Sequence, residues 1–124
     1  QSAEELGDGF LTFRRKHDAI LRVIDLGAAE GDRRFVRIRT RVHGAVAKPL
    51  AEAIEGQRAR SRAKDKEPSA AAVAGSLTTM LAAVAQQPKS LQSSGAKQTE
   101  LKPALTQLVH LGVTGRKPTP PKKK

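Results

Sequence analysis

The spacing of apolar residues changes near Pro49. Before Pro49, residues 35–42 alternate strictly: Phe35 and three arginines take the odd positions, and Val, Ile or Thr the even ones. An alternation with a period of two is typical of a half-exposed β-strand. With the turn-rich segments 16–18 and 27–32 as breaks, the pattern predicts strands over Phe10–Arg14, Ala19–Leu26 and Arg34–Val42.

The first two strands have a rival interpretation. Phe10, Phe13, His17 and Ile24 also fall at helical spacing, so residues 10–26 could form one amphipathic helix. We favour strands because residues 20–24 are rich in β-branched side chains, and because Gly27 and Gly31 bracket a loop of hairpin length.

After Pro49 the spacing becomes helical. Proline suits the first turn of a helix, where its missing N–H group is harmless, so we predict a helix over 49–61. A second helix is predicted over 69–87, with no charge between Ser69 and Gln87. Its apolar stripe would be Val73, Leu77, Met80, Leu81 and Val84. A third is predicted over 100–112, with Leu101, Leu105 and Leu108.

These elements predict an α+β fold in which a small antiparallel sheet of about three strands is packed by two or three helices. The polar residues 1–9 are not expected to form a helix. The predicted organisation is a polar N-terminal segment (1–9), a basic α+β domain (10–87), a linker (88–99), a short helix (100–112) and a basic tail (113–124).

Positive charge dominates the composition. The 124 residues include 23 Lys and Arg against 12 Asp and Glu, a formal net charge of +11. Such a surplus repels itself, and a polyanion relieves the repulsion, so nucleic acid is the expected partner. No apolar run approaches the length of about 18 residues that spans a bilayer, so no membrane partner is expected.

The cations fall into four clusters, which we predict to bind nucleic acid. Alternate arginines on one strand face would lie about 7 Å apart, roughly the spacing of phosphates along a nucleic-acid strand. Guanidinium groups bind phosphate bidentately, which lysine cannot do. The candidate residues are Arg14, Arg15, Lys16, Arg22, Arg33, Arg34, Arg37, Arg39, Arg41, Arg58, Arg60, Arg62, Arg116, Lys117, Lys122, Lys123 and Lys124.

Catalysis, metal binding and cofactor binding find no support in the sequence. Cysteine is absent, which excludes thiolate ligands, and His17, His43 and His110 lack partners at ligand spacing. Neither a glycine-rich phosphate loop nor a G-x-S-x-G motif is present. We therefore expect a protein that is not an enzyme and has no metal site and no cofactor.

Residues Phe13–Asp25, followed by the arginine-rich strand and a helix, resemble the small Alu-domain subunits of the signal recognition particle. Phe10-Leu11, Arg14–Lys16 and Asp18-Ala19 are also similar to the opening of a very small eukaryotic large-subunit ribosomal protein. Across residues 10–55, both resemblances imply a compact α+β protein whose basic sheet packs on structured RNA. By these resemblances, the residues that face the RNA would be Arg14, Arg15, Lys16, Arg22, Arg37, Arg39 and Arg41.

The favoured hypothesis is a non-catalytic RNA-binding structural subunit of a ribonucleoprotein, ribosomal or ribosome-associated. Structured RNA is bound through its backbone and shape, which suits many arginines and few aromatic residues.

One alternative is a dimeric ribbon-helix-helix DNA-binding protein that places strand 34–42 in the major groove. Another is a protein-interaction subunit whose neighbours in a large complex contact helix 69–87. The expected location is cytoplasmic, and an organellar location stays open because the first residue is Gln1 rather than Met, which a cleaved targeting segment would explain.

Overall fold

The chain folds into α-helices. The computed structural model describes residues 2–61, 68–86 and 93–115, and these ranges contain five helices and no strand. The helices are α1 (Ala3–Lys16), α2 (Asp18–Ala29), α3 (Arg33–Ser61), α4 (Ala70–Gln86) and α6 (Gln98–Thr114). The predicted α+β fold, with its antiparallel sheet, is therefore wrong.

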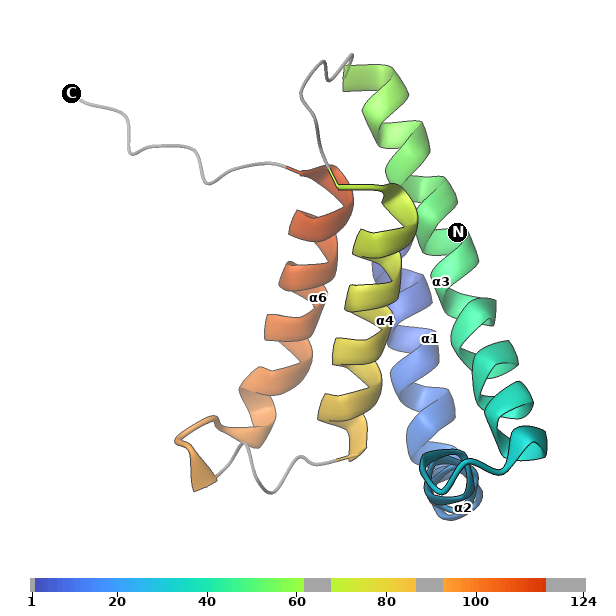
Figure 1. Ribbon diagram of the computed structural model, residues 1–124. Helices are drawn as coiled ribbons and strands as arrows, with labels where there is room; N and C mark the ends of the chain where they lie inside the picture. Colours follow the sequence, from blue (N-terminus) through green and yellow to red (C-terminus); the bar gives the residue numbers. More distant parts are fainter. Residues whose placement is uncertain (1, 62–67, 87–92, 116–124) are drawn as a thin grey trace.

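Four of the helices lie side by side, and α2 crosses one end of the group (Figure 1). Helix α3 packs on α4 and on α2, while α1 packs on α6 and α4. The core lies between α1, α3, α4 and α6. Its most buried large side chains are Leu50, Ile54, Leu81, Val109 and Thr78.

Residues 34–42 are the first part of α3 and not a strand. Their alternation ends at Val42, whereas a helical row continues through Val46, Leu50 and Ile54, all of which are buried. Val36 and Ile38, the expected apolar face of the strand, are exposed. The helix forms because the longer row buries more apolar surface than a nine-residue strand would.

Asp32 begins α3 well before Pro49. The Asp32 carboxylate accepts the backbone N–H of Arg34 at 2.9 Å, and its carbonyl accepts that of Val36. The Arg34 side chain also donates to this carboxylate and lowers the pKa of Asp32. Pro49 lies inside the helix, so the predicted start at residue 49 is wrong.

Residues 3–29 form two helices, which differs from both interpretations of that stretch. Ser2 caps α1 by accepting the backbone N–H of Glu5 at 3.1 Å, so a helix begins inside the polar segment 1–9. His17, with φ −112° and ψ 28°, separates α1 from α2. The helical spacing over 10–26 indicates helix rather than strand, but the single helix of that alternative is wrong because the chain breaks at His17.

The two C-terminal helices were predicted correctly in type and place. Ser69 caps α4 through the backbone N–H of Ala72 at 3.1 Å, and α6 extends slightly beyond the predicted 100–112. Helix α6 ends at Gly115, whose φ of +64° favours glycine. Residues 88–92 of the predicted linker and 116–124 of the basic tail lie outside the described residues.

The Phe35 ring packs against the backbone of α2 at Gly27. A Cβ atom at Gly27 would overlap three carbons of the ring. We expect Gly27→Ala to lower the free energy of unfolding by about 1–3 kcal/mol, since the ring must move. Urea unfolding followed by circular dichroism measures the change.

Gly9 provides the matched control because it also lies inside a helix and a Cβ there meets nothing within 4 Å. Gly9→Ala should raise the free energy of unfolding by about 0.5–1 kcal/mol through the usual helical preference for alanine. A Gly27→Ala protein as stable as Gly9→Ala would contradict the close approach.

Glu4 joins the first turn of α1 to α6. Its Oε1 lies 2.7 Å from Nδ1 of His110, and this hydrogen bond is the main cause that lowers the pKa of Glu4 from 4.5. Because the pKa of Glu4 is lower in the folded state than in the unfolded state, the ionised carboxylate stabilises the folded protein at pH values above the unfolded-state pKa. This stabilisation is lost as the pH falls through the folded-state pKa. We expect wild type to melt higher than Glu4→Gln at neutral pH, with the gap closing below about pH 4.5.

Glu5→Gln is the control, because Glu5 shares the first helical turn and lies one residue away. Thermal melts from neutral pH down to pH 3 would compare the three proteins. If the difference in melting temperature between wild type and Glu4→Gln were the same at every pH, ionisation of Glu4 would not contribute to stability.

A candidate ligand cavity between α1, α2, α3 and α4

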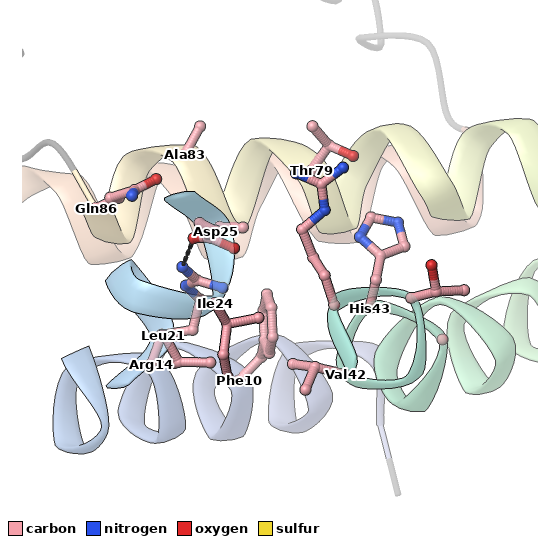
Figure 2. A pocket seen from close by; sticks show the side chains of 14 residues that line it. Phe10, Arg14, Leu21, Ile24, Asp25, Val42, His43, Thr79, Ala83 and Gln86 are labelled. Carbon is pink, nitrogen blue, oxygen red and sulfur yellow. Dashed lines mark hydrogen bonds and ion pairs between the residues drawn. The ribbon is translucent and has the colours of Figure 1, made fainter. Parts of the chain in front are cut away.

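A cavity of about 600 Å³ lies where α2 crosses α1, α3 and α4. This volume falls within the range of about 300–1,000 Å³ that is usual for small-molecule sites. Much of its wall is apolar and comes from all four helices: Phe10, Leu21, Ile24, Val42, Ala82 and Ala83. Figure 2 shows Phe10 and Val42 on one side of the cavity and Ala83 on α4 opposite.

An ion pair lies at the α2 side of the cavity. Arg14 of α1 donates to Asp25 of α2 at 2.9 Å, and their side chains are only 8% and 20% exposed (Figure 2). The Arg14 guanidinium carbon also lies 5.9 Å from the centre of the Phe10 ring, a favourable placement for a cation. Arg14 is therefore a structural residue that ties α2 to α1.

Arg39 and His43 bring cationic and hydrogen-bonding groups to the cavity from α3. Arg39 lies on the side of α3 that carries the buried row, between Phe35 and Val42, where an apolar side chain would be expected. His43 follows one turn later, on the side of α3 that faces α4 (Figure 2). Within the described part of the chain, neither side chain has a hydrogen-bond or ion-pair partner.

A second, more open cavity of about 580 Å³ lies between α1 and α3. Phe13, which is 40% exposed, and Arg41 line it. Phe10 and Val42 line both cavities. These two side chains therefore form the wall between them.

The helix separates the arginines that the strand interpretation had aligned. Successive residues turn by about 100°, so Arg37 and Arg39 point about 200° apart. All three arginines are exposed, but Arg39 lines the first cavity and Arg41 the second, whereas Arg37 lines neither. The single arginine-bearing face that supported the phosphate interpretation does not exist.

The other predicted site residues are dispersed. Arg22 pairs with Asp18 at 2.9 Å, Arg34 with Asp32 at 3.1 Å, and Arg60 donates to Gln57 at 3.0 Å. Arg15, Lys16 and Arg33 are exposed, and Arg58 is half-buried. Arg62, Arg116, Lys117, Lys122, Lys123 and Lys124 lie outside the described residues. Contact of these cations with nucleic acid stays a prediction from the sequence.

Several cavity residues were missed by the sequence reasoning. Asp25 and His43 were treated as isolated groups, and Phe10 and Val42 as strand residues. The available signal was the helical row from Phe35 to Ile54, in which Arg39 replaces an apolar residue. Among the described residues, no group of three His, Asp or Glu side chains could hold a metal ion. None of the described helices is long and apolar enough to cross a membrane.

The Arg14–Asp25 pair can be tested by a double-mutant cycle. Arg14→Leu leaves a partly buried carboxylate without its partner, so the free energy of unfolding should fall by about 1–3 kcal/mol. Adding Asp25→Leu should restore much of that loss, because an apolar pair removes the unpaired charge. Urea unfolding provides all four values, and strictly additive losses would show that the pair has no coupling energy.

In a comparison with protein families, residues 1–120 match the family described as tetracyclin repressor-like, C-terminal domain. No curated protein and no solved structure matches the chain. The family match and the helices overturn the resemblance to the signal recognition particle and ribosomal proteins. The RNA-binding function, the ribonucleoprotein location and the partners expected from them are corrected with it.

The ribbon-helix-helix alternative is also wrong, because its DNA-reading strand 34–42 is part of a helix. Five helices and a match over nearly the whole chain agree with each other. The chain belongs to the family of tetracyclin repressor-like C-terminal domains.

Proposed function

We propose that this chain is the ligand-binding and dimerisation domain of a transcription regulator. The observation that carries the proposal is the family match over residues 1–120, joined to a cavity of about 600 Å³ lined by four helices. The expectation of a non-catalytic protein becomes part of this proposal. The domain would bind a small molecule and respond by changing the arrangement of its helices.

The position of the cavity suits such a response. A ligand shifts a conformational equilibrium only by as much as it binds one arrangement better than the other. A molecule in this cavity would contact α2 together with α1, α3 and α4, so its affinity depends on how α2 lies across the other helices. The Arg14–Asp25 pair is the polar link in that arrangement.

Helices α4 and α6 provide a surface for a second copy of the chain. They lie next to each other on the near face of Figure 1, and a Cβ at Gly112 of α6 would meet Leu77 of α4. Helix α4 carries no charged residue. Its outward side has only small side chains, namely Ala72, Ser76, Thr79 and Ala83, all of which are exposed.

Helix α6 adds a leucine-rich stripe beside that surface. Leu101, Ala104, Leu108 and Leu111 recur at helical spacing on the side of α6 that borders α4, and Leu108 is 47% exposed. Two such helices from each copy would form a four-helix contact around a twofold axis. The small residues of α4 would let the helices approach closely, and the leucines of α6 would supply apolar area.

Sedimentation velocity tests this surface. We expect the wild-type domain to sediment as a dimer, and Leu108→Glu and Ser76→Glu each to sediment as monomers. A twofold interface brings each new carboxylate into an apolar contact twice, and burial of unpaired charge is costly. Both side chains are exposed in one copy of the chain, so circular dichroism should still show folded helices.

Ile20→Glu is the matched control. Ile20 is 59% exposed on α2, away from α4 and α6, and its replacement should leave the dimer intact. A wild-type monomer at concentrations of about 0.1 mM, or a Leu108→Glu dimer, would overturn the proposed surface.

A further inference from the structure

We infer that the cavity between α1, α2, α3 and α4 binds a small amphipathic anion, with an acidic head group on an apolar body. This inference rests on the proposed ligand-binding function and specifies the chemical class of the ligand. It follows from the cavity's charged groups, its hydrogen-bond donors and its apolar wall, taken in turn.

The charged groups of the cavity are unbalanced. Asp25 is the one acidic residue among those that line it, and its carboxylate already accepts a hydrogen bond from Arg14. Arg39 is exposed to solvent at the edge of the cavity and has no acidic partner in the described ranges. The cavity therefore carries one uncompensated guanidinium, which an anionic head group would neutralise.

The hydrogen-bond donors point to the same class of ligand. The hydroxyl groups of Thr40 and Thr79 donate to carbonyl groups of their own helices, both at 2.8 Å. The guanidinium of Arg39 and the ring of His43 have no such internal partner among the described residues. They are one helical turn apart on α3 and can approach the same acceptor. A carboxylate provides two acceptor oxygens.

The rest of the cavity wall suits an apolar body. Phe10, Leu21, Ile24 and Val42 line it, and the first three are buried residues of α1 and α2. An inorganic anion would leave this wall in contact with water, whereas an alkyl or aromatic body would cover it.

A cationic ligand does not suit this arrangement. It would meet Arg39 without a free carboxylate to offset the repulsion. It could recruit Asp25 only by breaking the bond to Arg14, which would leave a buried guanidinium without a partner. A neutral ligand could use the apolar wall but would leave Arg39 unpaired.

Isothermal titration calorimetry with three probes of equal chain length tests the inference: octanoate, 1-octanol and octyltrimethylammonium. We expect octanoate to bind at least about tenfold more tightly than the other two, since a charge-assisted hydrogen bond is worth that much or more. Arg39→Met should reduce octanoate affinity by about tenfold or more and leave that of 1-octanol unchanged.

Arg37→Met is the matched control, because it removes the same charge from the same helix on the side facing solvent. It should leave octanoate binding unchanged. Ala82→Trp, which fills the cavity from α4 and lies off the proposed dimer surface, should abolish octanoate binding. Octanoate binding that survives Arg39→Met or Ala82→Trp, or that Arg37→Met weakens equally, would overturn the inference.

The outcomes separate this inference from the proposed function. If 1-octanol or octyltrimethylammonium binds as tightly as octanoate and Ala82→Trp abolishes that binding, the ligand cavity stands and the anionic class is wrong. If no probe binds while the wild-type domain sediments as a dimer, the anion inference fails and the dimer surface remains.

Discussion

The ion pair between Arg14 and Asp25 fixes the position of helix α2, which forms one side of the cavity. Helix α2 buries Leu21, Ile24 and Ala28, but it leaves the apolar side chains Ile20, Val23 and Leu26 exposed. Apolar burial is not directional, so it does not by itself select how α2 crosses the end of the bundle. A hydrogen-bonded ion pair at 2.9 Å is directional, and it holds α2 in its position across the end of α1, α3 and α4.

Helix α3 connects the core to the cavity along one row of residues. Leu50 and Ile54, in its second half, are fully buried against the other helices. Arg39, in its first half, occupies the same row at the point where α3 borders the cavity. The cavity is thus a hollow that apolar side chains do not fill, and it is open to solvent at its edge, where Arg39 lies.

The sequence revealed the helices whose signals are local and missed those that depend on distant packing. The apolar spacing from Val73 to Val84 and the leucines at positions 101, 105 and 108 were sufficient for two helices. Residues 35–42 satisfy a period of two, and only the continuation through Val46 and Leu50 shows the helix. The charge of +11 does not specify where cations lie, since Arg14 is buried and Arg37 exposed. The cavity joins Phe10 to Gln86, which no local spacing could indicate.

Helix α4 takes part in both proposed contacts, with a consequence for how the domain would signal. Thr79 and Ala83 line the cavity, and they also belong to the small-residue side that would face a second copy. If ligand and second copy both favour the same position of this helix, their binding free energies are coupled, and thermodynamic linkage makes the coupling reciprocal. Dimer formation would then change the affinity for the ligand by the same factor by which the ligand changes the affinity between the two copies. Helix α4 alone would connect the two sites.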